Sequence, residues 1–392
     1  MDSKEFHIGL GNNDTSIRDS AKSDFISFWG ERAKLLKWFK PWQKTLDWNP
    51  PFAKWFVGGE INASYNTLDV NQQEKSSKTA IFWEGEDGSS RIITYGDLFL
   101  QVKKFANALK SLGIKSGDRI TIYLPMVPEL VIAMLSCARI GAIHTVVFSG
   151  FSATSLRDRV EDSGSKIIIT ADGGFRKGKL IKLKEIVDES AAGVSSVEHV
   201  VVLRRANNEI SLNQKDCLWS DLVNKSSEEC DAEKLDSTHP LYILYTSGTT
   251  GKPKGVLHGT GGYLTHLYST FKWAFDIKDD DVYFCTADIG WVTGHSYVTY
   301  GPLLHGATQV MYEGAPDYPS ASRMWDIIQK YHVTIFYTTP TALRMFMKFG
   351  DDVPNSFDLS SLRLLGTVGE PINPEVWNCL LYVIGKNKSP II

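Results

Sequence analysis

The sequence predicts an α/β protein built from mostly parallel sheets with helices on both faces. Short runs of β-branched and aromatic residues alternate with helical patterns along most of the chain, which is typical of strand–helix–strand units. Of the 392 residues, 43% are hydrophobic and 22% are charged, so the chain has enough apolar material for a large core. This length favours two domains, or one large domain with an appendage.

The first element is an aromatic-rich N-terminal segment, which we place at residues 1–75, ahead of a main domain at 76–392. Its stretch "FISFWGERAKLLKWFKPWQKTLDWNPPFAKWF" has helical rather than alternating spacing, and the polar run "DVNQQEKSSK" follows it. We therefore expect helices whose Trp and Phe side chains pack onto the main domain, in a structural rather than a binding role.

The main domain is predicted element by element. Thr94 and Asp97 form a capping-box signature, apolar residues follow at helical spacing, and Gly113 supplies a stop. Strands are predicted for "RITIYL", "IHTVV", "KIIIT", "EHVVVL", "LYILY", "TQVMY", "VTIFYT" and "LRLLGTV". Helices are predicted at 129–140, near Leu156, at 320–331, after Pro340 and from Asn373, with Pro374 in the first turn. The polar stretch 224–238 is predicted to be a surface connection.

The composition limits the kinds of molecule that the protein is expected to bind. Forty-two Lys and Arg against 45 Asp and Glu give a net charge of −3, which offers no attraction to nucleic acid or an anionic membrane. The five cysteines have an odd count and no C-x-x-C spacing, so they indicate a reducing cytoplasm rather than disulfides or zinc. The start lacks the features of a signal peptide, and prolines and charges interrupt the apolar stretch 120–148. We expect a cytoplasmic protein that acts on a small metabolite.

The stretch "YTSGTTGKPKGV", residues 245–256, is the strongest candidate site. It lies between the predicted strand "LYILY" and the helix-like "GYLTHLYSTFKWAF", where glycines permit a nest of backbone N–H donors for phosphate. The candidate phosphate ligands are Thr246, Ser247, Gly248, Thr249, Thr250, Gly251, Lys252 and Lys254. Taken alone, such a run is more often a flexible turn. It is not a Walker loop, because Pro253 follows Lys252 where Ser or Thr is required.

The full pattern of this loop resembles the phosphate loop of the adenylate-forming enzymes. The stretches "DIGWVTGHSYVTYGPLLHGAT", "YTTPTALRM", "GTVGEPINPEVW", "YNTLDV" and "FSGFSATSLRDRVEDSGSK" are similar to the AMP-forming acetyl-CoA synthetases, a branch of that family. The similarity runs from about Tyr65 to the last residue. It implies the large N-terminal domain of the adenylate-forming fold, incomplete at its C-terminal end.

The resemblance implies a two-step reaction with ATP, Mg²⁺ and coenzyme A. A short carboxylate, with acetate favoured, attacks the α-phosphorus of ATP and releases pyrophosphate, and the coenzyme A thiol then displaces AMP from the acyl-adenylate. Positioning and neutralisation of phosphate charge must then carry most of the catalysis.

The resemblance also assigns residues to three sites. The acyl pocket is Trp291, Val292, Thr293 and Val368; adenine is lined by Gly369, Glu370 and Pro371; and coenzyme A is bound by Arg176, Lys179, Thr293 and Asp317. Lys179 stands where the family usually has Arg, and Asp317 where it has Asn, so an added carboxylate can weaken phosphate binding. The segment "GGFRKGKL" is not a Walker loop, because Leu180 replaces the hydroxyl. His258, His295 and His305 are expected to be structural rather than metal ligands.

The resemblance implies parts that this chain does not hold. They are the "WWQTETG" segment with the magnesium-binding glutamate and a second pocket tryptophan, the ribose-binding aspartate, and a small C-terminal domain with the catalytic lysine. Residues 1–392 alone are therefore expected to be inactive, with a separate chain carrying these parts as a candidate partner. The end "SPII" is expected to leave an exposed sheet edge.

Two alternative functions remain open from the sequence. One is a propionyl- or 3-hydroxypropionyl-CoA synthetase, because one methylene is worth only ~1–3 kcal/mol in an apolar pocket. The other is a non-catalytic nucleotide-binding or interaction protein descended from such a ligase.

Overall fold

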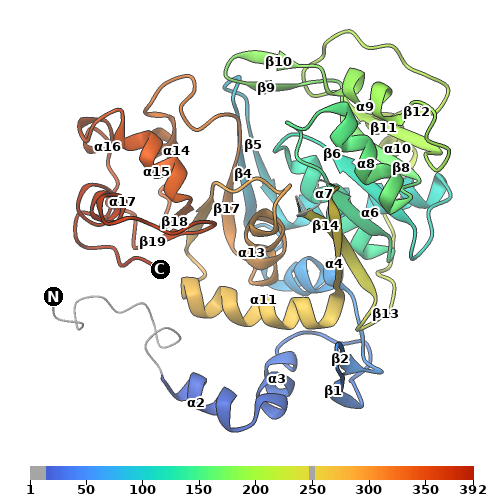
Figure 1. Cartoon of the computed structure of the whole chain (residues 1–392), viewed down its shortest axis with the longest axis horizontal. Coiled ribbons are helices and arrows are strands. Elements are labelled where there is room, and N and C mark those ends of the chain that lie inside the picture. Colours follow the sequence, from blue (N-terminus) through green and yellow to red (C-terminus); the bar gives the residue numbers. More distant parts are fainter. Residues whose placement is uncertain (1–14, 247–251) are drawn as a thin grey trace.

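The computed structural model describes residues 15–246 and 252–392. Two large sheets dominate the chain (Figure 1). The seven-stranded sheet has the order β12 (Asp216–Leu218), β11 (His199–Leu203), β8 (Ile167–Ala171), β6 (Arg119–Tyr123), β7 (Ile143–Val146), β14 (Pro240–Thr246) and β15 (Lys254–Gly259). The six-stranded sheet has the order β19 (Leu364–Thr367), β18 (Ile335–Thr338), β16 (Val282–Cys285), β17 (Thr308–Glu313), β4 (Thr79–Gly85) and β5 (Ser90–Thr94).

Pairing in both sheets is parallel except at one edge of each. The antiparallel pairs are β14 with β15 and β4 with β5. Helices connect the parallel strands, as expected for strand–helix–strand units. In the first part of the main domain these helices are α6 (Tyr95–Ser111), α7 (Pro128–Arg139), α8 (Ala153–Ser163), α9 (Leu183–Ala191), α10 (Trp219–Lys225) and α11 (Thr260–Phe275). The predicted α/β class with mostly parallel sheets is confirmed.

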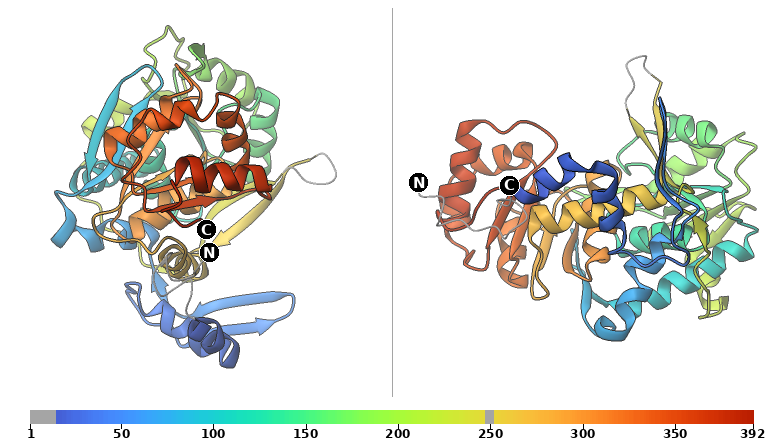
Figure 2. Two further views of the ribbon diagram at one scale, coloured as in Figure 1. Left: turned by 90° about the vertical axis from the view of Figure 1, so that its left-hand side faces the viewer. Right: turned by 90° about the horizontal axis from the view of Figure 1, so that it is seen from below.

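The later helical segments follow the same plan. They are α12 (Val292–Gly294), the π-helical turn η2 (His295–Tyr300), α13 (Gly301–Leu304), α14 (Arg323–Tyr331), α15 (Pro340–Met347), α16 (Asp352–Asn355), α17 (Pro374–Asn378) and the π-helical turn η3 (Cys379–Ile384). Together with β18 and β19, the helices from α14 onward form one end of the molecule (Figure 2).

Local sequence signals place several of these boundaries. Thr94 and Asp97 form both hydrogen bonds of the capping box at the start of α6, and Gly113 has a φ of 84° after its end. Asn373 caps α17, with Pro374 in its first turn. These predictions are confirmed because the signals act over a few neighbouring residues and do not depend on distant packing.

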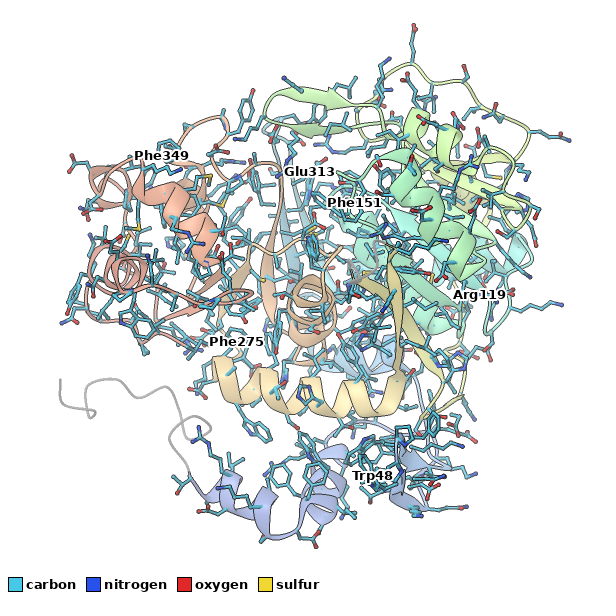
Figure 3. The ribbon with its side chains drawn as sticks, viewed as in Figure 1. Trp48, Arg119, Phe151, Phe275, Glu313 and Phe349 are labelled. Atoms are coloured by element: carbon cyan, nitrogen blue, oxygen red, sulfur yellow. The ribbon has the colours of Figure 1, made fainter. Side chains whose placement is uncertain are left out.

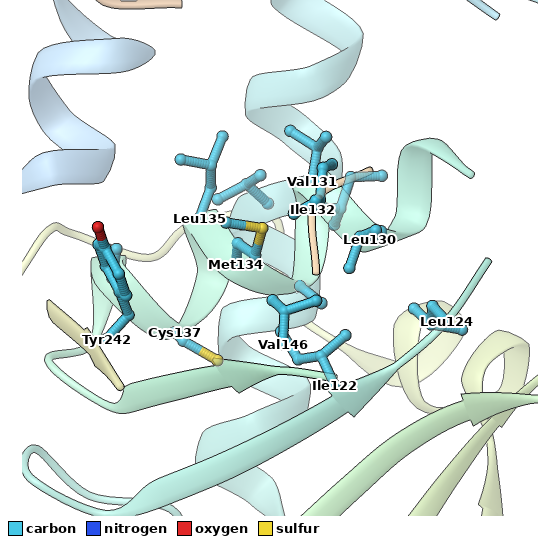
Figure 4. Packing of buried hydrophobic residues seen from close by; sticks show 14 of the residues in the cluster. Ile122, Leu124, Leu130, Val131, Ile132, Met134, Leu135, Cys137, Val146 and Tyr242 are labelled. Atoms are coloured by element: carbon cyan, nitrogen blue, oxygen red, sulfur yellow. The ribbon is translucent and has the colours of Figure 1, made fainter. Parts of the chain in front are cut away.

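The predicted strand, helix and strand over 120–148 are confirmed as β6, α7 and β7. Every residue of α7 except Glu129 is buried. Figure 4 shows Leu130 and Met134 of α7 above Ile122 and Val146 of the two strands, with Cys137 beside them. The apolar run is therefore a buried crossover, and no helix in the described residues is long and apolar enough to cross a bilayer.

Two buried clusters hold the layers together. The first joins both sheets through α6, α7 and α11, whereas the second lies on the opposite face of the six-stranded sheet, under α14, α15 and α17. Successive side chains of a strand point to opposite faces of the sheet, so one strand contributes residues to both clusters. In β18, Ile335 and Tyr337 belong to the first cluster and Phe336 to the second.

The N-terminal segment differs in part from the predicted run of helices. It contains α2 (Thr15–Ser23), α3 (Phe25–Ala33), an antiparallel hairpin of β1 (Lys44–Asn49) and β2 (Phe52–Val57), β3 (Glu60–Ile61), α4 (Ala63–Thr67), the short helix η1 (Asp69–Asn71) and α5 (Gln72–Lys75). The helical prediction is wrong over 44–57, where Pro50 and Pro51 impose a turn that no helix accommodates.

The aromatic residues of this segment pack onto the main domain as expected. The ring centroids of Phe28 and Trp29 lie 5.9 Å and 6.3 Å from that of Trp273 in α11. A buried ion pair fixes the following segment: both guanidinium Nη atoms of Arg139 donate to Asp69, at 2.8 and 3.0 Å. The Arg139 Nε donates to the carbonyl of Cys230 at 2.6 Å, so one side chain joins three distant parts of the chain.

The chain around the glycine-rich stretch differs from the predicted strand, loop and helix. The strand β15 begins at Lys254, within the stretch, and pairs antiparallel with β14, from Thr246 opposite Lys254 to Pro240 opposite Gly259; α11 begins only after β15. The two strands extend beyond the body of the protein in Figure 2. The prediction that the loop leads directly into a helix is therefore wrong, because β15 lies between the loop and α11 and pairs with β14.

The final residues pair with the edge of the six-stranded sheet that the sequence predicted to be exposed. The amide of Leu365 donates to Pro390 at 2.9 Å, and the amide of Ile392 donates to Leu365 at 3.0 Å. Residues 390–392 thus run parallel to β19 and satisfy backbone groups along its outer side.

Candidate functional site

A cavity of about 870 Å³ opens between the two large sheets. Its wall comes mainly from residues at or just beyond the carboxyl ends of parallel strands: Pro125 and Met126 after β6, Phe148 to Gly150 after β7, Thr286 to Asp288 after β16, Tyr312 to Asp317 at and after the end of β17, and Val368 and Gly369 after β19. Ligands of open parallel sheets bind at this position. Glu313 and Phe151, labelled in Figure 3, mark the region where the two sheets face each other.

The four predicted acyl-pocket residues lie together on this wall. Trp291 directly precedes α12, Val292 and Thr293 begin it, and Val368 follows β19. The Trp291 indole is 54% exposed and meets the ring of Phe151 edge to face at 6.4 Å. Trp291 is therefore not an ordinary core residue, and its ring is available to a bound molecule.

A tight turn presents Trp291 to the cavity. The carboxylate of Asp288 accepts the Gly290 amide at 2.7 Å, and a Cβ on Gly294 would lie 2.2 Å from the carbonyl oxygen of Asp288, so only glycine fits there. Burial raises the pKa of Asp288 to about 6, against the opposing effects of the Gly290 amide and the Arg176 charge. Asp288 lies within the stretch "DIGWVTGHSY", but sequence reasoning did not assign it to the site.

The predicted coenzyme A residues lie at the rim of the cavity. Arg176 ends β9 (Gly174–Arg176), Lys179 begins β10 (Lys179–Ile181), and these strands form an antiparallel hairpin. Arg176 and Asp317 line the cavity, whereas Lys179 does not. Lys177, which the sequence analysis missed, forms an ion pair with Asp317 at 2.8 Å and also lines the cavity. The negative charge that Asp317 adds at this rim is thus offset by a neighbouring cation.

Of the predicted adenine segment, only Gly369 lines the cavity, with a φ of 93°. The Glu370 carboxylate instead accepts the Thr341 amide at 2.7 Å and the Arg344 guanidinium at 2.6 Å, and it also bonds to the Thr341 hydroxyl. These hydrogen bonds from Thr341 and Arg344 lower the pKa of Glu370. Pro371 is exposed beside it. Glu370 therefore fixes the turn after β19 to α15, leaving the Gly369 backbone at the cavity.

The predicted phosphate ligands are described only in part. Ser247, Gly248, Thr249, Thr250 and Gly251 lie outside the described residues. Thr246 ends β14, Lys254 begins β15, and Lys252 lies two residues before it; all three are exposed, and none of them lines the cavity. Their assignment to phosphate binding remains a prediction.

The three histidines singled out by the sequence have structural surroundings. His295 is fully buried, its Nδ1 lies 3.1 Å from the Trp291 carbonyl, and burial lowers its pKa to about 4. His258 stacks on Tyr242 at 4.3 Å, and the Nε2 of His305 lies 2.9 Å from the carbonyl of Tyr268. Within residues 15–246 and 252–392, no group of three His, Cys, Asp or Glu side chains could hold a metal ion.

Comparison with known proteins gives two matching family models. The model of AMP-binding enzymes matches residues 68–391, and the model of the acetyl-coenzyme A synthetase N-terminus matches residues 15–67. An acetyl-coenzyme A synthetase from Chlorobaculum tepidum is 53% identical over 392 residues, which cover 100% of this chain and 60% of the relative. One from Streptomyces avermitilis is 55% identical over 378 residues, covering 95% of this chain and 58% of the relative.

A solved structure is similar over nearly the whole chain. Acetoacetyl-CoA synthetase from Streptomyces lividans superposes with a TM-score of 0.86 at 26% sequence identity, covering 94% of this chain and 57% of that chain. The present chain thus spans about 60% of the length of the relatives that it matches.

Proposed function

Because the chain belongs to the family of AMP-binding enzymes, we propose that its cavity serves the ATP-dependent activation of acetate to acetyl-CoA through an acyl-adenylate. The observation that carries the proposal is the convergence of Trp291, Val292, Thr293, Val368 and Gly369 on one wall. These residues are far apart in the sequence, and an open parallel sheet brings ligand-binding loops together in this way.

Each part of the wall has a proposed role. The alkyl tail of the acid lies against Trp291, Val292 and Val368, where steric limits favour a short chain. Adenine approaches the backbone of Gly369. Coenzyme A enters past the rim that carries Arg176, because a guanidinium binds phosphate oxygens in a paired geometry.

The triphosphate is proposed to bind at Thr246–Lys254. Magnesium would supply positive charge to the triphosphate, and it usually reaches such sites with the nucleotide, held by one or two carboxylates. The described residues offer no metal-binding cluster, so no step is assigned to the ion.

The remaining proposals concern the whole protein. We propose an N-terminal segment at 1–75 ahead of an AMP-binding domain at 76–392, and a cytoplasmic location. The acid is acetate by preference, and the remaining part of the catalytic machinery, corresponding to the rest of the relatives' length, is the proposed partner of this chain.

The acyl pocket can be tested with AMP alkyl esters, which imitate an acyl-adenylate without requiring turnover. The unchanged chain is expected to bind the AMP ethyl ester at least about tenfold more tightly than the AMP hexyl ester, because Trp291 limits the length of the tail. Replacing Trp291 with alanine is expected to reduce this preference to about threefold or less. Isothermal titration calorimetry measures both affinities.

The control for this experiment is Trp377→Ala. Trp377 lies on α17, is partly exposed and does not line the cavity, so its removal should leave the preference unchanged. Equal binding of the two esters by the unchanged chain would refute the acyl pocket. Absence of binding by either ester would refute the adenylate site and favour a non-catalytic role.

A second test concerns the proposed phosphate site at Thr246–Lys254. The double variant Lys252→Ala/Lys254→Ala is expected to bind ATP about 10- to 100-fold more weakly, since charge-assisted hydrogen bonds to phosphate are worth ~1.5–3 kcal/mol each and exposure reduces that value. Affinity for AMP should change less than about threefold, because the outer phosphates are absent. Lys348→Ala, an exposed lysine of the C-terminal part, is the matched control. Equal losses for ATP and AMP would contradict the assignment to the outer phosphates.

A further inference from the structure

Glu86 is a buried carboxylate that neither the sequence motifs nor the proposed reaction explains. It lies in the turn between β4 and β5 and is 5% exposed. One carboxylate oxygen accepts the Gly178 amide at 2.8 Å, and the other accepts the Ala315 amide at 2.7 Å. A single side chain therefore joins two segments that are far apart in the sequence.

Both segments form the rim of the cavity. Gly178 lies in the turn of the β9–β10 hairpin, directly after Arg176 and Lys177, and Ala315 lies in the loop after β17 that also carries Asp317. In Figure 1 the hairpin lies at the top of the molecule, near the upper end of β5. The carboxylate of Glu86 thus lies at the base of the two elements that offer charged groups to an entering molecule.

The β9–β10 hairpin needs contacts with other parts of the chain to hold its position. Its two strands have three residues each and, among the strands that the structure describes, pair only with one another. Isolated two-stranded hairpins of this size are marginal in water. At the tip, Gly178 has a φ of 71°, and a Cβ there would lie 2.4 Å from the hydroxyl of Tyr318, so the tip packs closely on the facing loop.

The loop after β17 is held from the same side. The Tyr312 hydroxyl donates to the carbonyls of Ala315 at 3.3 Å and Tyr318 at 2.9 Å. A Cβ on Gly314 would lie 2.8 Å from the Cβ of Glu86, so the backbone runs directly over the Glu86 side chain. The Lys177–Asp317 ion pair also joins the loop after β17 to the β9–β10 hairpin.

We propose that Glu86 is a positioning residue for coenzyme A. By accepting the amides of Gly178 and Ala315, it fixes the hairpin that presents Arg176 and the loop that presents Asp317. The spacing of the rim charges is then set before the anionic nucleotide part of coenzyme A arrives. This inference rests on the proposed function, and it adds a residue and a preorganised rim to it.

The test is Glu86→Gln, which keeps the size of the side chain but turns one acceptor into an N–H₂ donor facing an N–H group. Hydrogen exchange of the amides in 174–181 and 314–319 is expected to rise at least about tenfold. Affinity for coenzyme A, measured by calorimetry on this chain, is expected to fall at least about tenfold, whereas affinity for AMP changes less than about twofold. A general loss of stability would lower both affinities together.

Glu129→Gln is the matched control, because Glu129 is a partly buried carboxylate that forms an ion pair with Arg91 at 2.6 Å and lies outside both rim segments. If Glu86→Gln does not fold, Tyr312→Phe removes a hydroxyl bonded to the same loop; it should raise hydrogen exchange in 314–319 and reduce coenzyme A affinity about threefold.

Unchanged exchange in both segments would overturn the anchoring role of Glu86. Increased exchange with unchanged coenzyme A affinity would overturn the positioning role. If the unchanged chain binds AMP but not coenzyme A, the proposed coenzyme A site itself is wrong, and the exchange measurement still decides whether Glu86 anchors the rim.

Discussion

Replacing Arg139 with methionine is expected to lower the free energy of unfolding by about 3–5 kcal/mol, because it leaves Asp69 without its charged partner in a largely buried setting. Arg139 is 2% exposed, and the same change removes the hydrogen bond to the Cys230 carbonyl. Three distant parts of the chain lose their common contact. Denaturant unfolding followed by circular dichroism measures the loss.

An exposed lysine serves as the control. Its replacement shows how much stability is lost when a surface ion pair is removed. Lys182 pairs with Glu185 at 2.8 Å on the surface, where such pairs contribute little. Lys182→Met should therefore change stability by less than about 1 kcal/mol. Losses of similar size for the two variants would show that Arg139 does not join the N-terminal segment to the main domain.

Acidification from pH 7 to pH 5 is expected to weaken the fold through its buried histidines. Burial lowers the pKa of His295 and of His305 to about 4, and that of His144 well below its usual value. Above pH 6.5 these rings are neutral in the folded and unfolded chain alike. Below it the unfolded chain takes up protons that the folded chain does not, so His295 and His305 each cost about 2 kcal/mol of stability by pH 5, and His144 changes stability in the same direction.

Two carboxyl groups act in the opposite direction. Burial raises the pKa of Asp288 to about 6 and that of Glu313 to about 7, so the folded chain binds their protons first as the pH falls. Stability gained from these groups offsets part of the loss from the histidines. Comparing a histidine variant with the unchanged chain separates the contribution of that histidine to the pH dependence of stability from the contributions of the other groups.

His295→Gln is expected to reduce the stability difference between pH 7 and pH 5 by about 2 kcal/mol relative to the unchanged chain. Denaturant unfolding at both pH values measures the difference, and absolute stability at pH 7 does not enter it. His199→Gln, at the half-buried start of β11, is the control. A pH dependence equal to that of the unchanged chain would contradict the role assigned to His295.

Much of the fold could be predicted from local sequence. Alternating apolar runs and helical patterns gave the parallel sheets, and the capping box at Thr94 and Asp97 gave a helix start. The hairpins were missed for different reasons. Pro50 and Pro51 separate β1 from β2 in a stretch whose aromatic spacing imitates a helix. The pairing of β15 with β14 depends on contacts across the sheet, which spacing along the chain does not reveal.

Short motifs predicted several residues of the cavity wall, but not those whose position depends on long-range contacts. The stretch around Trp291 predicted a group that the cavity wall brings together. Asp288 lay in the same stretch, but its altered pKa arises from burial that no motif reveals. Lys177 contacts Asp317, and Glu86 contacts Gly178 and Ala315; these residues come close only in the folded rim. Glu370 matched a motif, yet its carboxylate turns to Arg344.

The cavity wall comes largely from loops that leave the strand ends, while the two buried clusters lie beneath it. Substitutions in these loops can change the shape of the wall without altering the packing that stabilises the sheets. The molecules that fit such a cavity can therefore differ among related proteins whose fold stays the same. The acetoacetyl-CoA synthetase from Streptomyces lividans keeps the same fold as this chain at 26% sequence identity.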